Sequence, residues 1–82
     1  MIGTHNEESI KSIIKQIDDI GFKNQINLKT ADVSRVLAVS NSTLEKWRKE
    51  GIGIDYNQVG GRIFYTKQAI AEWLIKTKIK TL

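Results

Sequence analysis

The most constraining feature of this 82-residue chain is the stretch VSNSTLEKWRKEGIG, which spans residues 39–53. Ser40 is a typical N-cap residue, because its hydroxyl can accept a hydrogen bond from the backbone N–H three residues later. Leu44 and Trp47 lie three residues apart and therefore share one face of a helix. Gly51 can end the helix in a conformation that most other residues resist. The stretch predicts a short helix with a buried face and a charged outer face.

A second helical pattern, TADVSRVLAVS, leads directly into this stretch. Thr30 is expected to cap its start, and Asp32 suits the positive end of the helix dipole in the first turn. Its inward face is formed by apolar residues at helical spacing, which are Val33, Val36 and Leu37. Ala38 and Val39 are expected to form the turn. Two short helices joined by such a turn form a helix-turn-helix motif.

A β-hairpin is expected after the motif, in IDYNQVGGRIFYT. Gly60 and Gly61 favour a tight two-residue turn, because both central positions of such a turn can require positive φ. The flanking β-prone runs are Tyr56–Val59 and Ile63–Tyr65. Thr66 is then expected to cap a last helix, KQAIAEWLIKTK, with inward residues Ile70, Trp73 and Leu74. A hairpin in this position is a wing.

The N-terminal run NEESIKSIIKQIDDIGF predicts a further amphipathic helix, with Asn6 as its cap and Gly21 at its end. Its apolar residues recur at helical spacing: Ile10, Ile13, Ile14, Ile17 and Ile20. This stripe has to be covered, either by the rest of the domain or by a second copy of the chain. The segment NQINL follows as an extended link.

The predicted fold class is therefore mostly α with a small β-hairpin (α+β), a winged helix-turn-helix preceded by an extra N-terminal amphipathic helix. We expect residues 1–27 to form that helix and its link, and residues 28–75 to form the winged domain. Residues 76–82 are expected to be a basic C-terminal tail. Trp47, Trp73 and Phe64 are expected in the core, whereas Tyr56 and Tyr65 are left open between the core and a phosphate contact.

The net charge of +4 is unevenly distributed along the chain. Residues 1–34 carry four Lys against five Asp or Glu, which is −1, and residues 35–82 carry nine Lys or Arg against four Glu or Asp, which is +5. A basic half suggests an anionic partner, most often nucleic acid. A soluble surface that happens to be basic would have the same composition, so charge alone does not distinguish it from a nucleic-acid-binding surface.

Other function classes are disfavoured by what the sequence lacks. It has no Cys and a single His, His5, so we expect no metal site and no cofactor. No nucleophile, base and orienting group can be assembled, so we do not expect an enzyme. The start resembles no secretory signal, and no apolar run reaches the roughly 20 residues that span a bilayer. We expect a cytoplasmic protein, located on DNA and not in a membrane.

The sequence contains LKTADVSRVLAVSNSTLEKWRKEG, VGGRIFYT and QAIAEWL in this order, over residues 28–74. Together these pieces resemble the winged helix-turn-helix DNA-binding domain shared by phage and mobile-element excisionases and MerR-type regulators. The chain departs from the family in having Ser34 where Ala is usual and Ala38 where the turn often has Gly. It also lacks the Pro that many members have before the wing.

The outer face of residues 41–50 is the predicted contact with the major groove of double-stranded DNA. In such motifs the N-terminal residues of the second helix meet base edges, here Asn41, Ser42 and Thr43. Lys46 can reach a guanine or a phosphate, and Glu45 can accept from a cytosine amino group. Arg48 and Lys49 are expected to meet the phosphate backbone. The alternative is an ordinary solvated helix face.

The wing is expected to place Gly60, Gly61 and Arg62 along the backbone or in the minor groove, where the negative potential favours Arg. Lys67, at the start of the last helix, is a further candidate for a phosphate contact. The alternative for the wing is an ordinary hairpin with a solvated Arg.

The resemblance implies two roles. One is an excisionase, a recombination directionality factor that binds repeated sites, bends DNA and directs a recombinase or integrase towards excision. The other is a small transcriptional regulator of a phage, plasmid or genomic island. Both imply double-stranded DNA as a partner. Because a single domain of this size covers few base pairs, useful specificity would need dimers, tandem copies or a second protein. A third possibility, from another class, is a winged-helix protein-interaction module such as a packaging adaptor or an antirepressor, which would not depend on Lys46 and Arg62.

Overall fold

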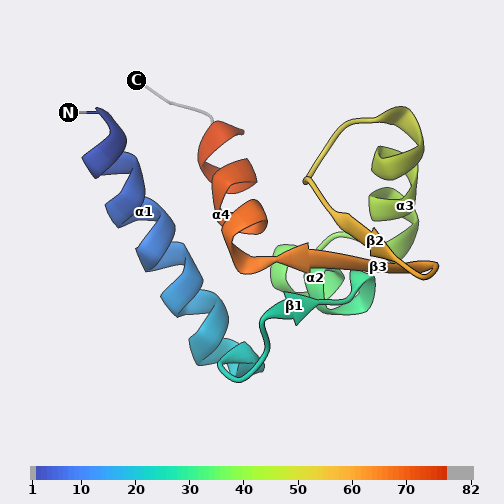
Figure 1. Cartoon of the computed structure of the whole chain (residues 1–82), viewed down its shortest axis with the longest axis horizontal. Helices are drawn as coiled ribbons and strands as arrows, with labels where there is room; N and C mark the ends of the chain where they lie inside the picture. The colour runs from blue at the N-terminus through green and yellow to red at the C-terminus, as the bar shows by residue number, and fades with distance from the viewer. Residues whose placement is uncertain (1, 78–82) are drawn as a thin grey trace.

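The computed structural model describes residues 2–77, with the side chains of residues 7–77. The predicted fold class is confirmed: helices and a small antiparallel sheet form an α+β winged helix-turn-helix (Figure 1). In chain order the elements are α1 (Ile2–Ile17), the π-helical turn η1 (Asp18–Phe22), β1 (Asn27–Leu28), α2 (Thr30–Leu37), α3 (Asn41–Glu50), β2 (Asn57–Val59), β3 (Arg62–Thr66) and α4 (Lys67–Lys76). The predicted basic tail, 76–82, lies mostly outside the described residues.

The helix α1 begins at Ile2, before the predicted cap at Asn6, because a capping residue permits a helix start without preventing the helix from extending further back. Its stripe packs within the chain: Ile17 is 2% exposed and Ile13 packs against the core. Ile20 is 61% exposed and was wrongly assigned to the stripe. It lies in η1, where Gly21 has φ of 118° and kinks the chain, so the α-helical spacing of the stripe no longer holds and Phe22 is the buried residue.

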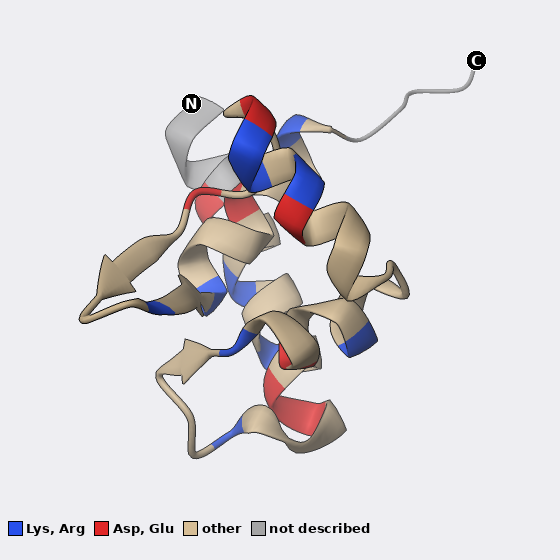
Figure 2. Ribbon diagram, turned by 90° about the vertical axis from the view of Figure 1, so that its right-hand side faces the viewer, with Lys and Arg blue, Asp and Glu red and all other residues tan. Residues whose placement is uncertain are grey.

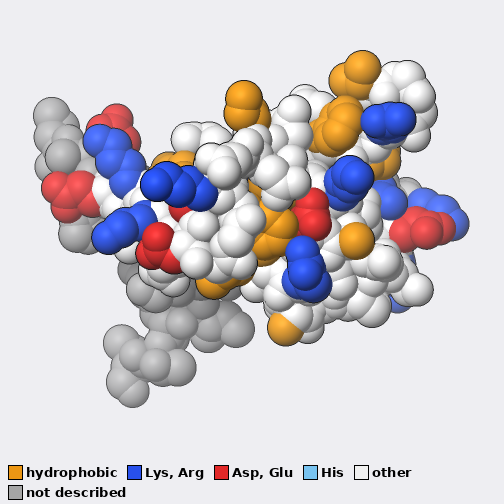
Figure 3. All heavy atoms as spheres, turned by 90° about the horizontal axis from the view of Figure 1, so that it is seen from below, with side chains coloured by type: hydrophobic (Ala, Val, Ile, Leu, Met, Phe, Trp, Pro, Cys, Tyr) orange, Lys and Arg blue, Asp and Glu red, His pale blue; other side chains and the backbone are white. Residues whose placement is uncertain are grey.

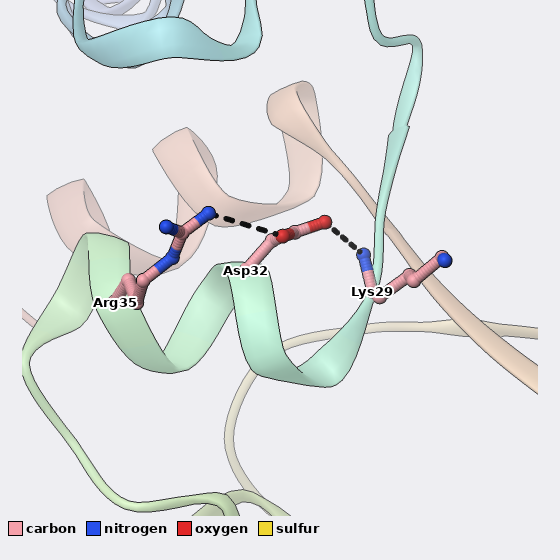
Figure 4. A network of polar contacts seen from close by, with 3 residues as sticks. All are labelled: Lys29, Asp32 and Arg35. Atoms are coloured by element: carbon pink, nitrogen blue, oxygen red, sulfur yellow. Dashed lines mark hydrogen bonds and ion pairs between the residues drawn. The ribbon is translucent and has the colours of Figure 1, made fainter.

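The helix α2 begins one residue earlier than predicted, with Lys29 and not Thr30 as its N-cap. The carboxylate of Asp32 accepts a hydrogen bond from the backbone N–H of Lys29 at 3.1 Å and forms an ion pair with Arg35 at 3.5 Å (Figure 4). The negative charge in the first turn therefore satisfies a free backbone donor at the helix start.

The turn between α2 and α3 is closed by Ser34, one of the positions where the chain departs from the resembled family. Its hydroxyl donates to the carbonyl of Val39, and its own carbonyl accepts from the Val39 N–H at 3.1 Å. Ala38 adopts the left-handed conformation, with φ of 57°. Ser40 then caps α3 as predicted, since its hydroxyl accepts from the backbone N–H of Thr43 at 3.1 Å.

The predicted wing is present as the hairpin β2–β3, Asn57–Thr66. Val59 pairs with Arg62 across a two-residue turn in which Gly60 and Gly61 have φ of 55° and 82°. These positive angles are what a tight turn between twisted strands requires. The predicted link NQINL contributes β1, which makes β3 the central strand of the order β1-β3-β2, with Leu28 opposite Tyr65.

The core lies between the helices and the inward face of β3. Its buried members come from every part of the described chain and are Ile17, Phe22, Leu28, Val33, Leu44, Ile54, Tyr65 and Ile70. Trp47 and Trp73 pack against this cluster with their ring centroids 5.2 Å apart, so each tryptophan contributes to the core as expected. Phe64 does not belong to the buried cluster and was wrongly placed there. It is half-buried and lies on the opposite face of β3 from Tyr65, because successive strand residues alternate.

The exposed apolar side chains are scattered over the described surface. The large ones are Ile20, Ile26, Ile52, Tyr56 and Val59. On the face seen from below, hydrophobic side chains occupy separate spots between charged and polar ones (Figure 3). Scattered apolar residues are normal on a folded protein. None of the helices in residues 2–77 is long and apolar enough to cross a membrane.

Candidate nucleic-acid interface

The second helix of the motif and the wing lie on the same side of the molecule, whereas α1 lies on the opposite side (Figure 1). This arrangement results from the order of the elements: α3 is followed by a short loop, and the hairpin then turns back along the sheet towards α4. The predicted recognition helix α3 and the wing can therefore face one common partner.

The outer face of α3 is open to solvent. Asn41, Ser42, Glu45, Lys46 and Lys49 are all exposed. Four of these residues line a shallow open depression along the helix, and they are Ser42, Glu45, Lys46 and Lys49. Lys49 and Glu45 form an i,i+4 ion pair at 3.2 Å with side chains 75% and 58% exposed. An exposed pair of this kind contributes little to stability, so both side chains can exchange partners at low cost.

Thr43 differs from its neighbours at the start of α3, because it belongs to the cap. Thr43 is half-buried, and its hydroxyl forms a hydrogen bond of 2.9 Å with the hydroxyl of Ser40. A base contact through Thr43 would compete with this hydrogen bond. The predicted base contact of Thr43 stays a prediction.

Arg48 points inward to a larger extent than the sequence indicated. The residue is half-buried, and its Nη1 donates to the hydroxyl of Tyr65 at 2.6 Å and to the hydroxyl of Thr30 at 3.4 Å. Its guanidinium carbon also lies 5.9 Å from the ring centroid of Tyr56. The alternation of residues along β3 predicts which of its side chains point inward, Tyr65 among them. No signal in the sequence indicates that Arg48 donates a hydrogen bond to Tyr65.

The wing tip is exposed, including Gly60, Gly61 and Arg62. Among the described residues the side chain of Arg62 forms no ion pair or hydrogen bond, so its guanidinium is available to an anionic partner. The wing therefore offers a cation at the position where the sequence predicted one.

Lys67 is placed differently from the other predicted cations. Its ammonium forms an ion pair with the carboxylate of Asp18, and the two side chains are only 13% and 29% exposed. This pair ties the start of α4 to η1. A phosphate contact through Lys67 would have to displace Asp18, so the predicted phosphate contact of Lys67 stays a prediction.

The side of the molecule that carries α3 and the wing does not form a uniform basic patch. Lys and Arg segments (blue) alternate with Asp and Glu segments (red) across this view (Figure 2). Within residues 7–77 no group of three His, Cys, Asp or Glu side chains is placed to hold a metal ion. The features that mark this side are thus an exposed polar helix face and an unpaired Arg on a hairpin tip.

In the comparison with protein families, the model of a helix-turn-helix domain matches residues 28–78, which is more than half of the chain. The matched segment runs from β1 through α4 and includes every predicted contact residue. The comparisons with curated proteins and with solved structures gave no match.

Proposed function

Because the chain belongs to the helix-turn-helix domain family, a family of excisionase-like DNA-binding domains, we propose that it binds double-stranded DNA sequence-specifically through α3 and the wing. The observation that supports this most strongly is the exposed, capped helix α3, whose outer face carries Asn41, Ser42, Glu45, Lys46 and Lys49. An α-helix fits the major groove, where amide, hydroxyl, carboxylate and ammonium groups can distinguish base edges.

In this proposal the residues of α3 have different tasks. Asn41 and Ser42, at the N-terminal end, meet base edges. Lys46 reaches a guanine or a phosphate, Glu45 accepts from a cytosine amino group, and Lys49 contacts the backbone once DNA replaces its surface partner Glu45. Arg62 follows the backbone or enters the minor groove from the wing tip, where Gly60 and Gly61 allow close approach.

The test is the double variant Lys46→Ala/Arg62→Ala, titrated by fluorescence anisotropy with a duplex that the wild-type protein selects from a random-sequence pool. Each neutralised phosphate contributes about 0.9 to the slope of log K against log salt, so the variant should lose up to about 2 units of slope together with affinity. Both side chains are exposed, so stability should change by no more than about 0.5 kcal/mol per substitution.

The matched control is Lys11→Ala/Lys15→Ala, which removes the same charge from two exposed positions of α1, on the opposite side of the molecule. This control should retain the slope and most of the affinity. Equal losses in the two double variants would mean that binding responds to net charge alone, and would contradict the proposed face. An unaltered affinity in Lys46→Ala/Arg62→Ala would likewise mean that the DNA-contacting face is not the one formed by α3 and the wing.

For the biological role we propose an excisionase-like factor that directs a recombinase towards excision, supported by the family and by the sequence resemblance. Such a factor binds neighbouring copies side by side and bends the duplex. A gel-mobility assay with the selected site at different positions along a fragment measures that bend. A bent complex favours the excisionase role, whereas a straight complex favours the alternative of a small transcriptional regulator.

A further inference from the structure

The polar cluster behind α3 is the strongest feature that the proposed contacts do not use. Arg48 projects from α3 to the hydroxyl of Tyr65 on the central strand β3 and to the hydroxyl of Thr30 at the start of α2. Tyr65 is 1% exposed and its ring belongs to the core. Arg48 therefore joins the predicted recognition helix to both elements against which that helix must be oriented.

The donor–acceptor geometry favours a structural bridge over a loose contact. The bond of 2.6 Å to Tyr65 is short for a nitrogen donor, and hydrogen bonds in which the donor is charged are the strong ones. The rings of Tyr56 and Tyr65 lie 6.1 Å apart, and the guanidinium lies within 6 Å of the Tyr56 ring centroid, a distance at which cation and ring attract each other. The side chain of Arg48 is thus restrained by Tyr65 on the sheet and by Tyr56 in the loop between α3 and β2.

We propose that Arg48 is a positioning residue that fixes the orientation of α3 relative to β3 and the wing, and that it acts through the buried hydroxyl of Tyr65. The consequence for DNA recognition rests on the proposed function. If α3 and the wing must engage the duplex together, a small rotation of α3 misaligns its base contacts with the wing contacts. Losing the bridge should then reduce discrimination between sequences more than it reduces general attraction to DNA.

The decisive variant is Tyr65→Phe, because it removes one buried oxygen and leaves every charge in place. The Phe ring keeps the core filled, and Tyr65 cannot itself touch DNA at 1% exposure. A hydrogen bond to a charged group shifts an equilibrium by on the order of tenfold or more, so the preference for the selected duplex over a scrambled one should fall by roughly 3–10-fold. The salt slope should stay that of the wild type.

Two comparisons separate positioning from a direct phosphate contact. Lys49→Gln, at the neighbouring exposed position, should lower the salt slope by about 0.9 and leave the preference nearly intact, as expected for a phosphate ligand. Arg48→Gln combined with Tyr65→Phe should lose no more preference than Arg48→Gln alone, because both changes break the same bridge. The inference is overturned if Tyr65→Phe keeps the wild-type preference while Arg48→Gln behaves as Lys49→Gln does.

A measurement on the free protein keeps this inference separate from the proposed function. In ¹⁵N–¹H spectra without DNA, Tyr65→Phe should shift the amide signals of α3 in addition to those of its strand neighbours. If the wild-type protein shows no preference among duplexes, the proposed function fails, and the spectra alone decide whether Arg48 couples α3 to the sheet. Unchanged α3 signals would overturn the coupling whatever the binding result.

Discussion

Replacing Leu44 with Ala is expected to destabilise the protein by about 2–5 kcal/mol, because it leaves a cavity beneath α3. Leu44 is 1% exposed and is the buried anchor of that helix in the core. A domain of this length has a total stability of roughly 4–12 kcal/mol, at about 0.05–0.15 kcal/mol per residue. The variant should therefore be partly unfolded near physiological temperature, and urea unfolding followed by tryptophan fluorescence measures the loss.

The control for Leu44→Ala is Glu45→Ala, the next residue along the same helix. Glu45 is 58% exposed, and its ion pair with Lys49 lies on the surface, so its removal should cost no more than about 1 kcal/mol. Similar midpoints for the two variants would mean that α3 is not anchored through Leu44. The opposite face of α3 would then not be the one that the fold leaves free to contact a partner.

Replacing Gly53 with Ala is the second substitution with a large expected effect. Gly53 has φ of 86°, and an added Cβ would lie 2.9 Å from both the Cβ and the Cε3 of Trp47. The Cβ of Trp47 cannot move without its backbone, so the contact cannot be relieved by a side-chain rotation. Overpacking of this kind costs about 1–3 kcal/mol, in addition to about 1–2 kcal/mol for a left-handed Ala.

Gly51→Ala provides the matched control, because Gly51 has φ of 70° and no atom lies within 4 Å of its added Cβ. It should cost only the left-handed conformation, about 1–2 kcal/mol. The midpoint of thermal unfolding should thus be lower for Gly53→Ala than for Gly51→Ala, and the emission of Trp47 should change only in the former. Equal midpoints would show that the loop after α3 can move away from Trp47.

Local signals in the sequence accounted for most of the fold. Ser40 and Thr66 cap the helices that follow them, Gly51 ends α3, and the Gly60-Gly61 pair forms the wing turn. Each of these assignments depends on groups only a few residues apart, where the residue type restricts the backbone directly. The errors at helix starts, such as the cap at Lys29 in place of Thr30, are shifts within the same local pattern.

Long-range partners were not predictable from the sequence. Lys67 and Asp18 are 49 residues apart, and Arg48 and Tyr65 are 17 residues apart, so no periodic pattern relates them. Arg48 and Lys67 were both predicted to contact phosphate, but the tertiary fold brings the carboxylate of Asp18 to Lys67 and the buried hydroxyl of Tyr65 to Arg48. Strand β1 was missed for the same reason, because its pairing with β3 is non-local.

The most direct test of the central claim is an anisotropy titration of the wild-type protein with its selected duplex and with a scrambled duplex, each at two salt concentrations. The proposal that α3 and the wing read DNA predicts tight binding to the selected duplex that weakens steeply with salt, together with clearly weaker binding to the scrambled one. Identical weak binding to both duplexes, or no binding, would contradict sequence-specific DNA recognition and direct attention to a protein partner.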